Sequence, residues 1–287
     1  MALIKSLGMY FKLNREQKAF IRNKGFERKA SIPRLIHFLE PLCAYDEVSD
    51  KVSKVIGKML TFFFLSLFFV IFLGSILADK IPLSVVFGLL GIIAIVVIAL
   101  VILFFIFKKI DINNNLRNVV LPMLHILAME VGNRKSVQLK LNFNKALNKQ
   151  SLHEVEKKRT LFSRSETLFF AYDFLDLSCT FFDGTRLQWK VFDRIRKRTR
   201  SNGRKYKTKY KLKRRIISQL SFSQKSYSVV PNRTYRHGKM KEDKDKIVFK
   251  STIKQNADGL FADIDKTALL NTVARPYQFV TSRGSAQ

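Results

Sequence analysis

Lysines and arginines alternate with other residues on both sides of an Asn-Gly pair in the C-terminal half of the chain. Asn202 and Gly203 are the preferred pair for a two-residue type I′ turn, and β-branched and aromatic residues flank them. Because side chains alternate between the two faces of a strand, such a hairpin would gather eight cations on one face. The predicted anion-binding residues, in facing pairs, are Arg200 with Lys205, Arg198 with Lys207, Arg196 with Lys209, and Arg194 with Lys211.

Like charges that face each other across two strands repel by roughly a few tenths of a kcal/mol per exposed pair. We therefore expect this hairpin to be most stable with an anionic partner against it. Three interpretations stay open: anionic phospholipid headgroups, nucleic acid or another polyanion with Tyr206 and Tyr210 as stacking residues, and a solvated basic loop. The opposite face of the hairpin would be more apolar, with Ile195, Lys197, Thr199, Tyr206, Thr208, Tyr210 and Leu212.

The charge of the chain is distributed very unevenly. The formal net charge is +30 and the sequence pI is about 10.3, yet residues 59–78 and 83–107 contain no charged side chain. At 1.5 Å per residue, about 20 apolar residues cover the roughly 30 Å hydrocarbon core of a bilayer. Only Asp79, Lys80, Ile81 and Pro82 separate the two stretches. The sequence therefore predicts a transmembrane hairpin of two helices, and more than fifty preceding residues argue against a signal peptide.

Cations at the ends of the two spans predict the orientation of the hairpin. Lys51, Lys54 and Lys58 precede the first span, and Lys108, Lys109 and Arg117 follow the second, whereas the turn holds only Lys80. Basic residues are retained on the cytoplasmic side during insertion, so both termini are expected to be cytoplasmic. The spans contain no ionisable side chain, which disfavours a proton-coupled transporter.

Three small residues of the second span, Ser84, Gly88 and Gly91, lie on one helix face and are predicted helix-packing residues. The simpler interpretation is that they pack against the phenylalanines of the first span. A seam between copies of the chain is the alternative.

The flanks predict an α+β protein with an antiparallel sheet. The period changes to two at Val137, a second β-rich run covers residues 168–182, and Leu187, Trp189 and Val191 mark a returning strand after Asp183 and Gly184. A three-residue loop here would pair Cys179 with Trp189 and so match apolar faces. The predicted segments are an N-terminal cytoplasmic helical segment (1–57), the transmembrane hairpin (58–108), a juxtamembrane helix (109–136), a basic β-rich cytoplasmic domain (137–281) and a tail (282–287).

No catalytic constellation or cofactor site is predicted. Residues 263–267 spell D-x-D-x-T, which resembles the nucleophile motif of haloacid-dehalogenase-type phosphatases, but the rest of such a domain would have to follow and barely twenty residues remain. An aspartate that caps a short helix explains the motif better. Cys43 and Cys179 have no metal-ligand spacing, and phosphate-loop, serine-elbow and zinc-helix motifs are absent.

We interpret the chain as a non-enzymatic membrane protein whose basic cytoplasmic domain binds anionic lipid headgroups or another polyanion. A subunit of an oligomeric membrane pore or complex, formed through the helical hairpin, is the alternative. A membrane enzyme without a recognisable motif is third.

Overall fold

The structure is a computed structural model that describes residues 2–76, 82–132, 135–143, 147–160, 164–202, 205–231, 233–258 and 264–283. The chain divides into two compact units. The helical unit contains Met1–Arg22 and Glu40–Ile112, and the sheet unit contains Asn23–Leu39 and Asn113–Gln287.

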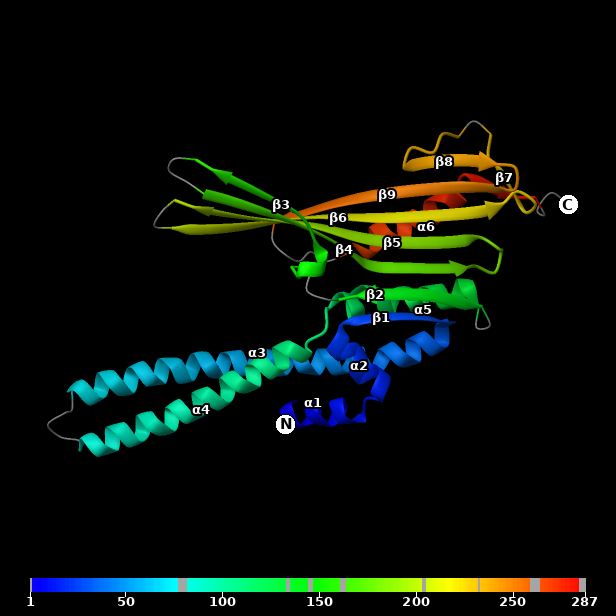
Figure 1. The fold of residues 1–287 in the computed structure, drawn as a ribbon. Coiled ribbons are helices and arrows are strands. Elements are labelled where there is room, and N and C mark those ends of the chain that lie inside the picture. Colours follow the sequence, from blue (N-terminus) through cyan, green and yellow to red (C-terminus); the bar gives the residue numbers. More distant parts are fainter. Residues whose placement is uncertain are drawn as a thin grey trace. The chain divides into compact units, whose positions relative to one another are not determined.

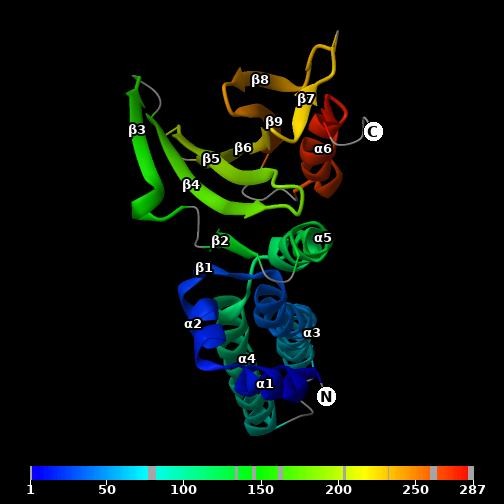
Figure 2. The same ribbon diagram turned by 90° about the vertical axis from the view of Figure 1, so that its right-hand side faces the viewer.

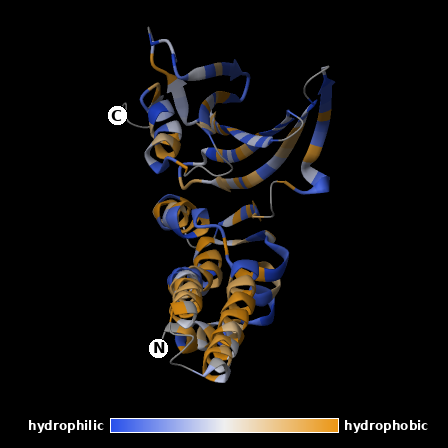
Figure 3. Ribbon diagram, turned by 90° about the vertical axis from the view of Figure 1, so that its left-hand side faces the viewer, coloured by the Kyte–Doolittle hydropathy of each residue, from blue (hydrophilic) through white to orange (hydrophobic). Residues whose placement is uncertain are grey.

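The helical unit is built on two long helices, α3 (Ile32–Ile76), whose residues 32–39 belong to the sheet unit, and α4 (Leu83–Ile110) (Figure 1). Hydropathy colouring shows how apolar most of both helices are (Figure 3). The predicted short N-terminal helix and the first predicted span are one continuous helix, with Pro41 inside it. Residues 79–81 of the predicted turn lie outside the described residues, and Pro82 directly precedes α4.

Two shorter helices, α1 (Ala2–Lys12) and α2 (Arg15–Asn23), precede α3. Asn14 caps α2, because its side chain accepts a hydrogen bond from the backbone N–H of Gln17 at 2.8 Å. The Gln17 side chain accepts one in return from the Asn14 N–H, which completes a capping box. Near the end of α4, Val52, Ile56 and Phe107 form a small buried cluster.

The sheet unit is an antiparallel sheet with strand order β1-β2-β4-β5-β6-β9-β8, and β3 pairs with β4 beside this path. Figure 2 shows that the sheet is twisted, so that the direction of its strands changes across the unit. The strands are β1 (Gly25–Ser31), β2 (Ser136–Asn142), β3 (Leu152–Arg159), β4 (Arg164–Thr180), β5 (Arg186–Ser201), β6 (Tyr206–Ser223), β8 (Gly238–Asp243) and β9 (Lys246–Asp258). A separate pair joins β7 (Tyr227–Val229) to β10 (Val280–Ser282). The predicted antiparallel sheet is confirmed.

The N-terminal segment is not wholly helical, contrary to our expectation. Residues of β1 pair along their whole length with β2, from Gly25 opposite Asn142 to Ser31 opposite Ser136. The two strands are separated by more than a hundred residues in the chain. A polar sequence such as that of β1 carries little strand signal of its own, so this pairing depends on the tertiary structure.

Four further helical segments of the described chain belong to the sheet unit, the shortest being a 3₁₀ turn, η2 (Lys149–Ser151). A π-helical turn, η1 (Leu116–Val120), leads into α5 (Leu121–Val131), which has Pro122 in its first turn, where the missing N–H of a proline costs no helical hydrogen bond. Helix α6 (Lys266–Tyr277) begins after Asp265, whose side chain accepts a hydrogen bond from the Ala268 N–H at 3.1 Å. This bond confirms the capping role predicted for the motif, of which Asp263 lies outside the described residues.

One face of the sheet, which we call the inner face, carries the core. On β5 it presents Leu187, Trp189, Val191, Asp193 and Ile195, all of them buried. Trp189 is fully buried, and its indole N–H donates a hydrogen bond at 3.1 Å to the Thr272 hydroxyl of α6. This bond joins the middle of the sheet to a helix 83 residues later in the chain.

The hairpin between β4 and β5 closes around three residues, 182–184, so the predicted loop length is confirmed, but the loop lies one residue earlier in the chain than predicted. Cys179 pairs with Leu187 and Leu177 with Trp189, so the register is shifted by two residues from the predicted one. The matching of apolar faces is confirmed, because a shift by two keeps every side chain on its face. The loop is closed by Phe181, whose N–H donates to the Thr185 carbonyl at 2.8 Å.

Asp183 ties this loop to two distant parts of the sheet unit. One carboxylate oxygen accepts hydrogen bonds from the hydroxyls of Thr185 at 2.8 Å, Tyr227 at 2.7 Å and Tyr277 at 2.9 Å. Burial alone would raise the pKa of Asp183, but these bonds outweigh it and hold the pKa below its usual value. Burial, with the bond to Asp183, raises the pKa of Tyr227 to about 12. The cluster is a structural tie among the β4–β5 loop, β7 and α6.

Candidate functional site

The outer face of β5 and β6 carries the cations singled out by the sequence. In both strands the residues of alternate positions point away from the buried core. Eight of the cations at these positions face one another in four pairs nearest the turn, and seven of these eight are exposed. We call this set the basic face. It consists of Arg194, Arg196, Arg198 and Arg200 on β5 and Lys207, Lys209, Lys211 and Lys213 on β6.

The pairs across the basic face differ from those that we predicted. Arg200 lies opposite Lys207 and Arg198 opposite Lys209, so the register is again shifted by two residues and Lys213 takes the place of Lys205. The predicted position of the turn, with Asn202 and Gly203 as its two loop residues, was therefore wrong. The Asn202 N–H donates to the Lys205 carbonyl at 3.2 Å, whereas Gly203 lies outside the described residues. The faces themselves are as predicted.

The four cations nearest the β5–β6 turn surround a hollow of about 190 Å³. Its lining consists of Arg198, Arg200, Lys207 and Lys209, two facing pairs on adjacent rows. Strands lie about 4.8 Å apart and successive residues on one face about 6.7 Å apart, so the four side chains start from the corners of a small rectangle. The Nε atom of Arg198 is shielded from solvent and donates no hydrogen bond to any described atom.

Carboxylates stand at the two sides of the basic face rather than within it. Glu154 and Glu156 of β3 are two strands away from Arg196 and Arg198, and Asp258 of β9 pairs with Lys211. Among the described residues, no ion pair neutralises a cation of the basic face. The face is therefore a concentrated positive surface with a narrow acidic border.

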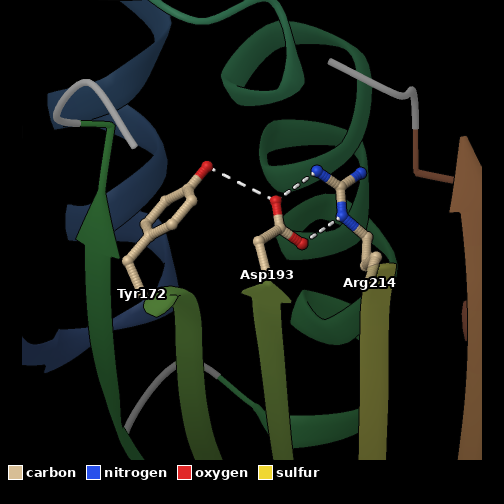
Figure 4. Close-up of polar contacts among 3 residues, drawn as sticks. All are labelled: Tyr172, Asp193 and Arg214. Atoms are coloured by element: carbon tan, nitrogen blue, oxygen red, sulfur yellow. Dashed lines mark hydrogen bonds and ion pairs between the residues drawn. The ribbon is translucent and has the colours of Figure 1, made fainter. Parts of the chain in front are cut away.

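A buried ion pair between Asp193 and Arg214 lies on the inner face, next in sequence to Arg194 and Lys213 of the basic face. Figure 4 shows the pair together with Tyr172. The Arg214 guanidinium donates two hydrogen bonds to Asp193, both at 2.7 Å, and only 3% of Arg214 and 1% of Asp193 are exposed. The Tyr172 hydroxyl donates to the same carboxylate at 3.3 Å. Burial and the neighbouring Asp193 charge raise the pKa of Tyr172. Sequence reasoning missed this pair, because its two members are 21 residues apart.

The rest of the inner face under the basic face is as apolar as predicted. Phe170, Ile195 and Leu212 form a buried cluster, and the Thr199 and Thr208 hydroxyls lie 3.3 Å apart. Lys197 pairs with Tyr210 on this face. Cross-strand apolar contacts of this kind offset the repulsion within the four like-charged pairs of the basic face.

The small residues of α4 do not pack within the hairpin. Ser84, Gly88 and Gly91 are exposed, and nothing lies within 4 Å of a Cβ added at Gly88 or Gly91. The close approach between α3 and α4 occurs instead at Gly74, where an added Cβ would lie 2.9 Å from the Val86 side chain. The interpretation of packing within one chain is therefore wrong for these three residues.

Three carboxylates gather in the helical unit, which the sequence did not indicate. Oxygens of Asp46, Asp50 and Asp111 lie within 4.8 Å of one another. Asp46 is buried and accepts a hydrogen bond at 3.2 Å from the Ile112 N–H, just after α4 ends. We assign this cluster a structural role, in which Asp46 fixes the end of α4 against α3.

Among known proteins, no family model, curated protein or solved structure matches the chain. Its function must therefore be inferred from its own geometry.

Proposed function

We propose that the chain is a non-enzymatic membrane protein, anchored by α3 and α4, whose basic face binds anionic lipid headgroups on the cytoplasmic side. The observation that carries this proposal is the alignment of eight cations on one face of a two-stranded ribbon. Each exposed cation near an anionic membrane contributes roughly 1 kcal/mol of attraction.

The exposure of the two long helices supports the membrane anchor. Each of the two helices contains an apolar window long enough to cross a bilayer, and only 6% of that window is buried within the chain. A core helix of a soluble protein would be mostly covered, because large contiguous exposed apolar surfaces are rare in such proteins. A bilayer would cover these helices, and the lysines at their outer ends favour both termini inside.

The anchor favours lipid over nucleic acid as the partner of the basic face. A tethered domain meets the headgroups at a high effective concentration, whereas nucleic acid must be recruited from solution. The aromatic side chains that could stack on bases, Tyr206 and Tyr210, belong to the inner-face positions of β6 rather than to the basic face.

Energy transfer from the single tryptophan tests this proposal in the intact protein. Full-length protein is placed in nanodiscs that contain a dansyl-labelled neutral lipid, with phosphatidylcholine alone or with added phosphatidylserine. We expect transfer from Trp189 to increase with phosphatidylserine and to decrease again with salt, because docking on headgroups is electrostatic. Substitution of Arg196, Arg198, Lys207 and Lys209 by glutamine should abolish the increase.

A matched control removes four lysines from the β8–β9 hairpin, Lys239, Lys241, Lys244 and Lys246, so that both variants lose the same charge. This control should keep the increase in transfer. If both variants respond alike, the basic face is not the lipid-binding surface. If an oligonucleotide binds the protein through the same four residues while phosphatidylserine has no effect, nucleic acid is the ligand.

The outward-facing small residues of α4 favour a second candidate function, assembly of several copies through the hairpin. Small residues allow close approach of another helix in a bilayer. Replacement of Gly88 by cysteine should give disulfide-linked dimers of the full-length protein in membranes, and the same replacement at the lipid-facing Phe87 should give far fewer. Equal cross-linking at the two positions would argue against a specific seam.

A further inference from the structure

We propose that the hollow between Arg198, Arg200, Lys207 and Lys209 binds a phosphomonoester group, such as the terminal phosphate of a lipid headgroup, in preference to a phosphodiester. This inference rests on the proposed function for the source of the phosphate, but not for the site itself. The proposed site involves only four of the eight cations of the basic face.

The size of the hollow suits a small anion. Its volume of about 190 Å³ lies below the roughly 300–1,000 Å³ typical of sites for drug-sized ligands. No aromatic or aliphatic residue is among the described residues that line it. A compact, highly charged group therefore fits better than an organic ring.

Arg198 supplies the most specific feature of the hollow. It is the only half-buried member of the basic face, and its Nε–H is shielded without a hydrogen-bond acceptor among the described atoms. Buried donors are normally satisfied, so this donor favours a conformation in which the side chain turns and meets an acceptor oxygen. A guanidinium can offer parallel N–H groups to two phosphate oxygens, which an ammonium cannot.

The charge of the hollow favours a dianion. Four cations start from adjacent positions on one face, and three of them are exposed side chains that can turn toward a bound group. A phosphomonoester has its second ionisation near pH 6 and carries a charge of about −1.5 to −2 at pH 7, whereas a diester carries one negative charge. The additional charge is attracted by all four cations at once.

Two bilayers of equal charge test the preference. Full-length protein is placed in nanodiscs with about 10 mol% phosphatidic acid, a monoester, or with about 20 mol% phosphatidylglycerol, a diester, in phosphatidylcholine. Energy transfer from Trp189 to a dansyl-labelled neutral lipid reports docking. We expect docking on phosphatidic acid to withstand about tenfold more competing glycerol 3-phosphate than docking on phosphatidylglycerol, because the monoester occupies the hollow.

Two facing pairs on the basic face provide matched variants. Arg198→Gln with Lys209→Gln removes one pair that lines the hollow, and Arg194→Gln with Lys213→Gln removes the same charge outside it. Only the first should abolish the preference for the monoester. Arg198→Lys keeps the charge but lacks the guanidinium, and it should reduce the preference while leaving docking on phosphatidylglycerol intact.

A soluble arm separates this inference from the proposed function. Glycerol 3-phosphate and its diester counterpart glycerophosphoglycerol are titrated against the protein in uncharged detergent, with binding followed by the ³¹P chemical shift. Selective binding of the monoester, lost with the first pair only, supports the site even if no anionic bilayer increases transfer. Equal response to both bilayers and to both soluble probes overturns the inference, and docking on either bilayer would then still support the proposed function.

Discussion

Replacement of Asp193 by alanine is expected to lower the free energy of unfolding of the sheet unit by roughly 3–5 kcal/mol. The substitution would leave the Arg214 guanidinium, which is 3% exposed, without the carboxylate that accepts its two hydrogen bonds. The penalty is the desolvation of a buried charge that has lost its counter-charge, and it is larger than the value of the pair itself. Urea unfolding of the full-length protein in uncharged detergent, followed by Trp189 fluorescence, measures it.

A double replacement distinguishes the loss of the pair from the loss of one partner. Asp193→Leu combined with Arg214→Met removes both charges and keeps apolar volume, so it should cost much less than Asp193→Ala alone. A surface control is Asp176→Ala, because the ion pair of Asp176 with Lys190 at 3.0 Å is partly exposed. Such a pair contributes about 0–1 kcal/mol. If Asp193→Ala costs no more than Asp176→Ala, the buried pair does not stabilise the sheet.

Truncation of Trp189 to alanine is expected to destabilise the sheet unit by about 3–5 kcal/mol. The side chain is 0% exposed, and it is the largest of the fully buried side chains. Its removal would leave a cavity at the centre of β5 and break the bond to Thr272 on α6. Hydrogen exchange of peptides from β5 and β6, measured by mass spectrometry on the full-length protein, reports this loss without the tryptophan.

Conservative variants separate the two contributions of Trp189. Trp189→Phe keeps most of the apolar volume and loses the indole donor, so its cost should be well below that of the alanine variant. Thr272→Val keeps the shape of the threonine and removes the acceptor, which leaves the indole N–H buried without that partner, at a cost of about 1–3 kcal/mol. An alanine variant that exchanges like the wild type would contradict the central position of Trp189 in the core.

Both predictions concern the scaffold that holds the basic face. Asp193 and Arg214 are adjacent in sequence to Arg194 and Lys213, which point to the opposite side of the same strands. The strands thus carry buried contacts on one side and repelling cations on the other. We expect loss of the inner-face contacts to weaken anion binding indirectly, since the cations would lose their fixed spacing.

The two hairpins illustrate how far a sequence pattern reaches. Alternation of apolar and charged residues correctly predicted which side chains of β5 and β6 share a face, because side-chain direction has a period of two. The same alternation is unchanged by a two-residue slip, so both predicted registers were wrong by two positions. In the β4–β5 loop, Thr185 and Asp183 provide the loop-closing bonds that select the observed register.

The sequence by itself determined the two long apolar helices, the basic alternation and the antiparallel class of the sheet, because each depends on composition or on a short period along the chain. Only the tertiary structure decided the pairs of the basic face, its hollow and the strand β1, because each requires contacts between residues far apart in the chain. It also showed that Gly88 and Gly91 face away from α3, which approaches α4 at Gly74 instead. Eight alternating cations thus predicted an anion-binding surface, and the fold gathers four of them around one hollow.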